Sequence, residues 1–202
     1  MSLWAIVPIK PLSLGKSRLA AVMPEEKRHA LNQKLYQDTL RILQKVDQIS
    51  NILVVSRDSD VLAYSREIGI RTVQENGSPD LNEALRRASL FTQLYSPNGL
   101  VIIPADLPLL TEADVIQVIE HAPPAPGAVI VPDRRREGTN ALLINPPDLI
   151  SFSFGFDSFN THCRLIKDAG ARLTILENDN IALDLDLPED LLFLEAHYKL
   201  AV

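Results

Sequence analysis

Several features are scarce in this sequence of 202 residues, and each scarcity excludes a class of protein. The single cysteine, Cys163, excludes an intramolecular disulfide and a cysteine-based metal cluster. No apolar run reaches 18 residues and no secretory signal is present, so we expect a cytoplasmic protein without a membrane partner. A formal charge of −6 argues against non-specific nucleic-acid binding, which needs a basic surface.

Two familiar nucleotide-binding motifs are also missing. Gly15-Lys16-Ser17 resembles the end of a P-loop, but Lys10 stands where that motif needs its first glycine. The glycine-rich dinucleotide fingerprint is absent as well. If the protein binds a nucleotide, it uses a different arrangement.

Short apolar runs alternate with amphipathic stretches along the chain. This alternation of predicted strands and helices is typical of βαβ units in an α/β fold, and it predicts a three-layer, mostly parallel sheet with helices on both faces. With 46% hydrophobic residues and no linker, residues 1–202 are expected to form one domain. The expected strands are 3–8, 51–56, 70–74, 101–103, 128–131, 141–144 and 172–176. The expected helices are 24–46, 60–68, 81–94, 111–119, about 154–168, and one that begins at 188.

An acidic residue, Asp106, follows the fourth predicted strand and lies between two prolines. Ligands of α/β sheets bind at the carboxyl ends of strands, where such a carboxylate is able to coordinate a hard cation. A bland alternative is that Asp106 caps the next helix. Thr111, followed by Glu112 and Asp114, already supplies that cap, so we favour a functional Asp106.

A basic loop follows the first predicted strand. Lys10, Lys16 and Arg18 surround Gly15, and cations beside free backbone N–H groups suit a triphosphate. Surface charge without a ligand is the alternative. Asn82, near the start of a later helix, is either part of its cap or a reader of a base or ribose, and the local sequence favours the cap.

Two further acids, Asp184 and Asp186, alternate with leucines, so an extended backbone points both to the same side. Two close carboxylates repel each other unless a cation lies between them. Together with Asp106 they would form a cluster suited to Mg²⁺, if the two segments meet in space.

The second half of the chain holds polar groups suited to an anion. Thr139 follows the arginine run 134–136, which is either solvated surface or part of an anion site. Gly155 and Ser158 precede a helix, although Ser158 is also a plausible N-cap. His162, inside that helix, is expected to be packed or surface-facing. Phe152, Phe154 and Phe156 are left open as substrate wall, core or dimer contact.

The whole chain resembles the 2-phospholactate or phosphoenolpyruvate guanylyltransferases of coenzyme F420 biosynthesis, within the molybdenum-cofactor-type nucleotidyltransferases. Four segments carry the resemblance: residues 7–10 with 15–19, residues 104–110, residues 138–142 with 154–159, and residues 184–191. It implies a nucleotide-diphospho-sugar-transferase-like, Rossmann-like fold. It also implies transfer of GMP from GTP to phosphoenolpyruvate, 2-phospho-L-lactate or 3-phosphoglycerate, with release of pyrophosphate.

The resemblance also implies a role for each candidate. The residues expected to bind GTP are Lys10, Lys16, Arg18 and Asn82, and those expected to bind the acid are Thr139, Gly155 and Ser158. Mg²⁺ is expected to bind to Asp106, Asp184 and Asp186. The residues expected to carry catalysis are Lys16, Arg18 and Asp106. Residues 79–82 depart from the glycine-rich form usual in the family. The alternatives are a sugar-1-phosphate or cytidine-cofactor nucleotidyltransferase, or a non-enzymatic nucleotide-binding protein. A homodimer is left open.

Overall fold

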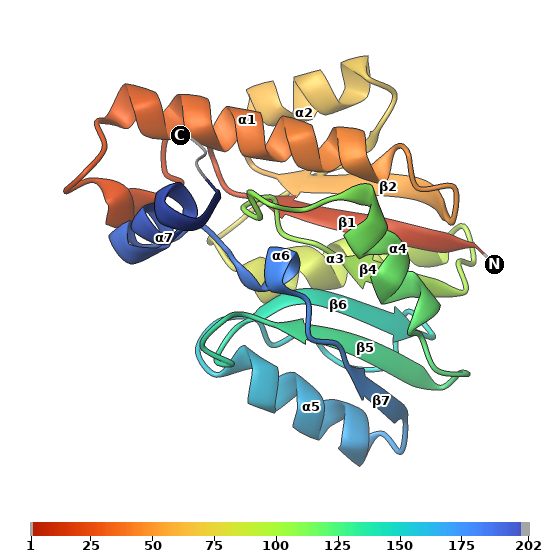
Figure 1. Ribbon diagram of the computed structural model, residues 1–202. Helices are drawn as coiled ribbons and strands as arrows, with labels where there is room; N and C mark the ends of the chain where they lie inside the picture. Colours follow the sequence, from red (N-terminus) through yellow and green to blue (C-terminus); the bar gives the residue numbers. More distant parts are fainter. Residues whose placement is uncertain (1, 199–202) are drawn as a thin grey trace.

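The computed structural model describes residues 2–198 and contains a seven-stranded sheet between layers of helices (Figure 1). The strands are β1 Leu3–Ile9, β2 Ile49–Ser56, β3 Arg71–Gln74, β4 Gly99–Ile102, β5 Gly127–Pro132, β6 Thr139–Asn145 and β7 Arg172–Ile175. Their spatial order is β3-β2-β1-β4-β6-β5-β7, and only β6 runs antiparallel to its neighbours. The predicted three-layer, mostly parallel α/β sheet is confirmed.

Alternate residues of the strands feed two separate cores. On β1, Ala5 and Val7 pack toward one face, while Trp4 and Ile6 pack toward the other. The first face is covered by α1, α2, α4 and the short α6, and the second by α3 and α5. The helices are α1 Glu25–Leu43, α2 Ser59–Glu67, α3 Leu81–Gln93, α4 Glu112–Glu120, α5 Ser158–Asp168, α6 Asp179–Ala182 and α7 Pro188–Tyr198, with a 3₁₀ turn η1 at Ser17–Leu19.

The reversed strand β6 decides which groups share an edge of the sheet. Leu142 of β6 pairs with Ile102 at the end of β4, and Thr139 pairs with Pro132 at the end of β5. Because β6 begins where its neighbours end, Thr139 lies at the carboxyl edge of the parallel strands. Asp106 follows β4 at the same edge.

Helix starts agree with the cap expected for α4. Thr111 accepts a hydrogen bond from the Asp114 N–H, and the Asp114 side chain accepts one from the Thr111 N–H, which completes a capping box. Asp106 is therefore not needed as a cap. At α3, the side chain of Asp80 accepts from the N–H groups of Asn82 and Glu83, so Asp80, and not Asn82, supplies the cap.

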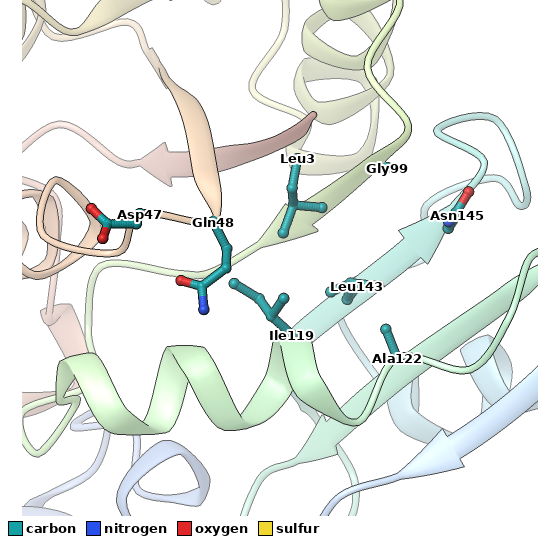
Figure 2. Close-up of a pocket in the computed structure, with 8 residues that line it drawn as sticks. All are labelled: Leu3, Asp47, Gln48, Gly99, Ile119, Ala122, Leu143 and Asn145. Atoms are coloured by element: carbon teal, nitrogen blue, oxygen red, sulfur yellow. The ribbon is translucent and has the colours of Figure 1, made fainter. Parts of the chain in front are cut away.

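A hollow of about 550 Å³ lies at the opposite edge of the sheet, where Leu3 and Gly99 begin their strands (Figure 2). Asp47 is the only charged residue among those that line it. A triphosphate needs cations, so this hollow does not suit one.

No helix in the range 2–198 is both long and apolar enough to cross a membrane.

Candidate active site

The basic loop after β1 is held in a fixed shape by a buried amide. The Asn32 Nδ2 donates to the Leu12 carbonyl at 2.9 Å. A Cβ on Gly15 would lie 2.4 Å from Asn32 Nδ2, so only glycine fits at this close approach. Lys16 follows in the left-handed region at φ 55°, and η1 begins after it. The loop thus turns Lys16 inward, where it is 8% exposed.

Two ion pairs join this loop to the predicted carboxylates. Lys16 Nζ lies 3.0 Å from Asp106 Oδ2, and Arg18 Nη1 lies 2.7 Å from Asp186 Oδ2. The Lys16 side chain is 5% exposed and that of Asp106 is 35% exposed, whereas Arg18 is 67% exposed. The first pair is the more strongly desolvated, so its charges interact more strongly than those of the second pair.

The acidic segments meet in space, as the sequence required for a shared cation site. The Leu185 N–H donates to the Asp106 carbonyl at 3.1 Å. Asn140, on β6, donates to the carbonyls of Ile181 and Ala182 and anchors the incoming segment. Residues 183–186 belong to no strand, yet burial alternates along them, which places Asp184 and Asp186 on the same side.

Asp184 lies in surroundings that disfavour its charged form. Burial, together with the nearby Asp106 carboxylate, raises the pKa of Asp184 to about 6. Carboxylate oxygens are the hard donors that Mg²⁺ prefers, and a divalent ion beside Asp184 would favour its charged form against both causes of the shift. Within residues 2–198, no three His, Cys, Asp or Glu side chains are grouped closely enough to hold a metal ion. In this structure Lys16 and Arg18 neutralise Asp106 and Asp186.

A pocket of about 440 Å³ opens over these groups at the carboxyl edge of the sheet. Lys10, Lys16, Asp106 and Asp186 line one part of it. The other part is lined by residues that follow β2 and β3 and by the start of α3, namely Arg57, Glu75, Pro79, Asp80 and Leu81. The pocket therefore has a strongly charged part and a second part whose walls combine apolar and polar groups.

The expected acceptor residues form a second polar group. The Ser158 hydroxyl donates to Thr139 Oγ1 at 3.3 Å, so Ser158 is not the N-cap of α5; Asp157 occupies that position, at φ 51°. Gly155 adopts φ 125°, which only glycine takes readily. Thr139 is the neighbour on β6 of Asn140, which holds the Asp184 segment, so the same end of one strand carries a contact to each group.

Asn82 joins the start of α3 to the segment that precedes Gly155. Its Nδ2 donates to the Phe154 carbonyl at 3.0 Å, and its Oδ1 accepts from the Phe154 N–H at 2.7 Å. The side chain therefore clamps the segment before Gly155. This clamp leaves the Asn82 amide one N–H and one lone pair for other contacts. A direct contact of Asn82 with GTP stays a prediction.

The arginine run does not form an anion site in this arrangement. Arg135 pairs with the buried Asp190 at 3.2 Å, and Arg136 pairs with Glu177. The Arg134 guanidinium lies 3.6 Å from the centre of the Phe193 ring. These contacts fasten the loop between β5 and β6 to the C-terminal segments. Phe152 and Phe154 pack against the second core, and Phe156 is 99% exposed.

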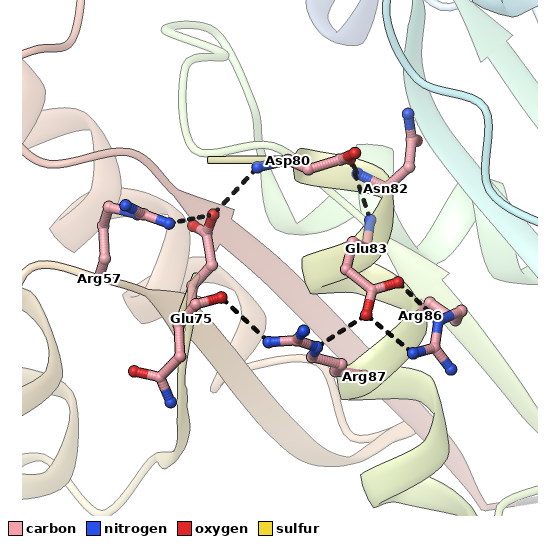
Figure 3. A network of polar contacts seen from close by, with 8 residues as sticks. Arg57, Glu75, Asp80, Asn82, Glu83, Arg86 and Arg87 are labelled. Atoms are coloured by element: carbon pink, nitrogen blue, oxygen red, sulfur yellow. Dashed lines mark hydrogen bonds and ion pairs between the residues drawn. The ribbon is translucent and has the colours of Figure 1, made fainter. Parts of the chain in front are cut away.

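The sequence interpretation missed Arg57, Glu75 and Asn140. Arg57 directly follows β2 and Glu75 directly follows β3, and that position at the carboxyl ends of strands was the signal that could have identified them. Arg57 donates to Glu75 Oε1 at 3.0 Å, and the Asp80 N–H also donates to that Oε1 (Figure 3). Arg57 also donates to the Gly77 carbonyl. Asn140 is recognisable only from its contacts.

The chain matches the family model described as "Guanylyl transferase CofC like" over residues 3–199. It belongs to the CofC-like guanylyl transferase family. A phosphoenolpyruvate guanylyltransferase from Rubrobacter xylanophilus is 40% identical over 196 residues, covering 97% of this chain and 95% of the relative. A 2-phospho-L-lactate guanylyltransferase from Methanothermobacter thermautotrophicus is 31% identical over 191 residues, covering 95% and 83%.

Solved structures place this CofC-like chain in the nucleotidyltransferase fold. A nucleotidyl transfer enzyme from Methanothermobacter superposes with a TM-score of 0.71 at 16% identity, covering 98% of each chain. A 4-diphosphocytidyl-2C-methyl-D-erythritol synthase gives 0.66 at 14% identity, covering 96% and 97%. At these identities the likeness shows the fold alone. With the family assignment, the predicted nucleotidyltransferase class is confirmed.

Proposed function

We propose that this protein transfers GMP from GTP to a phosphorylated three-carbon acid, with release of pyrophosphate, in coenzyme F420 biosynthesis. The observation that carries the proposal is the meeting of the basic loop with Asp106 and Asp186 at one pocket, where Lys16 Nζ lies 3.0 Å from Asp106 Oδ2. Relatives named for phosphoenolpyruvate and 2-phospho-L-lactate support the substrate class. Phosphoenolpyruvate is the acceptor to test first, because the 40% identical relative is named for it.

The proposed reaction needs no general base. A phosphate oxygen of the acid attacks the α-phosphorus of GTP, a new P–O bond forms, and the bond to the β-phosphate oxygen breaks as pyrophosphate leaves. The attacking oxygen is already anionic near neutral pH. The protein therefore contributes by aligning two anions and by neutralising their charge.

Each candidate residue has a part in this alignment. Lys10, Lys16 and Arg18 hold the triphosphate, and Thr139, Gly155 and Ser158 hold the acid beside it. Asp106, Asp184 and Asp186 hold Mg²⁺, which when bound supplies positive charge to phosphate oxygens. When GTP binds, Lys16 and Arg18 would turn from Asp106 and Asp186 to the triphosphate, and the two carboxylates would become available to hold Mg²⁺.

The test is pyrophosphate release with GTP and Mg²⁺, offered phosphoenolpyruvate, 2-phospho-L-lactate and 3-phosphoglycerate separately. We expect release with one of them, and the guanylylated acid as the second product. CTP, UTP and ATP in place of GTP test the alternative nucleotidyltransferases. Binding of GTP without release for any acceptor would favour a nucleotide-binding protein, and absence of GTP binding would contradict the proposal.

We also propose a cytoplasmic location, which suits the buried free thiol of Cys163.

Glu75 is the residue that we propose for recognition of guanine. Its Oε1 accepts from Arg57 and from the Asp80 N–H, whereas its Oε2 has no hydrogen-bond partner among residues 2–198. The Glu75 side chain is 15% exposed and lines the pocket. Guanine presents two adjacent donors, N1–H and the 2-amino group, to such a carboxylate, whereas adenine presents an acceptor there.

We expect Glu75→Gln to raise the KM for GTP by about tenfold or more, because an amide loses one charged hydrogen bond to the base. The preference for GTP over ATP should fall in parallel, measured as the ratio of the two kcat/KM values. Glu83→Gln is the matched control, since Glu83 is exposed and pairs with Arg86 and Arg87 on the surface of α3 (Figure 3). An unchanged preference in Glu75→Gln would contradict the assignment.

A further inference from the structure

His162 lies within the acceptor group although no role was expected for it. It is 0% exposed and stands on α5. Its Nδ1 lies 3.0 Å from Thr139 Oγ1, and its Nε2 accepts from the Ser153 N–H at 3.0 Å. Its ring also meets the ring of Phe154 edge to face, with centroids 4.8 Å apart. The imidazole therefore joins β6 to the segment that precedes Gly155.

The bond to Ser153 fixes the direction of every hydrogen in this chain of contacts. A backbone N–H only donates, so His162 Nε2 must carry a lone pair. Burial lowers the pKa of His162 to about 4, so the ring is neutral near pH 7 and holds its one proton on Nδ1. Nδ1–H then donates to Thr139 Oγ1.

The hydroxyl of Thr139 is left with one free function. Its oxygen accepts from His162 Nδ1 and from the Ser158 hydroxyl at 3.3 Å, which uses both lone pairs. Its own hydrogen has no acceptor within the described part of the chain. A hydroxyl in this state is a hydrogen-bond donor and cannot serve as an acceptor.

We infer that His162 is a positioning residue of the acceptor site, where its Nδ1-protonated ring makes the Thr139 hydroxyl an obligate donor to an anionic oxygen of the acid. The inference rests on the proposed function for the identity of that anion. It also gives a reason why the site takes an acid. A neutral substrate group that presents a hydrogen at this point would meet the hydrogen of the Thr139 hydroxyl, and no hydrogen bond would form between them.

The clamp from α3 completes the arrangement. Asn82 holds both backbone polar groups of Phe154, and His162 holds the N–H of the preceding residue. Two consecutive residues before Gly155 are thus fixed by side chains from different helices. Loss of His162 would release this segment and free the Thr139 hydroxyl to rotate.

The first test separates the two substrates kinetically. We expect His162→Phe, which keeps a ring of similar size, to raise the KM for the acid about tenfold or more while the KM for GTP stays within about twofold. His162→Asn, whose amide retains a donor near the Nδ1 position, should recover part of the affinity for the acid. His121→Phe, on an exposed ring at the end of α4, is the control.

A double-mutant cycle asks whether His162 acts through Thr139. In a Thr139→Val background, His162→Phe should add less than about twofold to the KM for the acid, because the hydroxyl that it orients is already gone. Effects that multiply in full, or an equal rise in the KM for GTP, would overturn the inference. A complete absence of guanylyl transfer in the unmodified enzyme would instead refute the proposed function.

The second test needs neither activity nor a folded variant. Long-range ¹H–¹⁵N correlation spectra of the unmodified protein distinguish the two neutral imidazole tautomers and the imidazolium. The chain has four histidines. One of them, the histidine that stays neutral down to about pH 4, is expected to give the cross-peak pattern of a neutral ring protonated at Nδ1. A buried histidine protonated at Nε2 would overturn the inference.

Discussion

Asp184→Asn is expected to make the protein more stable at pH 7 and nearly inactive. Burial and the neighbouring Asp106 raise the pKa of Asp184 from 3.8 to about 6. The folded state therefore binds this proton more tightly than the unfolded state. The stability that this provides is present below about pH 4 and is lost as the pH rises through 6. The difference corresponds to about 3 kcal/mol at pH 7, which the neutral amide retains.

The measurement is urea unfolding in the presence of a chelator, at pH 7 and again near pH 4. The variant should exceed the unmodified protein by about 3 kcal/mol at pH 7 and by less than about 1 kcal/mol near pH 4, where Asp184 is protonated in the folded state and roughly half protonated in the unfolded state. Turnover should fall about 10²–10³-fold. Asp168→Asn, at an exposed position, should change the free energy of unfolding by less than about 0.5 kcal/mol. Equal stability of Asp184→Asn and the unmodified protein at pH 7 would contradict the electrostatic argument.

The contribution of His162 to the free energy of unfolding has the opposite pH dependence to that of Asp184. This makes the comparison of Asp184→Asn with the unmodified protein more sensitive. Burial lowers its pKa to about 4, below the 6.5 of an exposed histidine. Its contribution is therefore complete above about pH 6.5 and is lost as the pH falls toward 4. In the unmodified protein the two groups oppose each other between pH 4 and 6. Asp184→Asn removes one of them, so its stability should decline more steeply on acidification across that range.

The fold was predictable because strand and helix signals are local. Buried runs such as 3–8 and 51–56 stand between clear helix starts, and Thr111 with Asp114 marks one of them. The direction of β6 was not predictable. A short apolar run such as 141–144 has the same pattern whether it pairs parallel or antiparallel. The four-residue α6 was also missed, because one helical turn has no periodicity to detect.

The candidate site was partly predictable for the same reason. Asp106 stood out because an acid soon after a buried strand is a local signal. Lys16 was also named from the basic loop, but its ion pair with Asp106 was not predictable, because the two residues are 90 positions apart and the contact depends on the fold of both loops. His162 could not be assigned a role from sequence, since its function follows from a backbone N–H and a hydroxyl on other elements. Polar networks of this kind are visible only in three dimensions.

Lys16→Met is expected to lower kcat/KM for GTP by about 10²–10³-fold. Lys16 is buried against Asp106 in this structure, and in the proposed mechanism it turns to the triphosphate. Methionine keeps the length and the apolar stem, but it carries no charge to place near the phosphates. The left-handed backbone at Lys16 is unaffected by this exchange, because both side chains begin with the same unbranched carbon.

Arg18→Met is the matched comparison, because Arg18 makes the same kind of pair with Asp186 but is 67% exposed. Water and salt screen that pair, so we expect its loss to cost at least tenfold less in kcat/KM than the loss of Lys16. A binding measurement without nucleotide adds a second readout. Lys16 competes with a metal ion for Asp106, so Lys16→Met should bind Mn²⁺ about tenfold more tightly, measured by electron paramagnetic resonance. Weaker Mn²⁺ binding in Lys16→Met would mean that the Lys16–Asp106 pair assembles the metal site, and the partner exchange proposed here would be wrong.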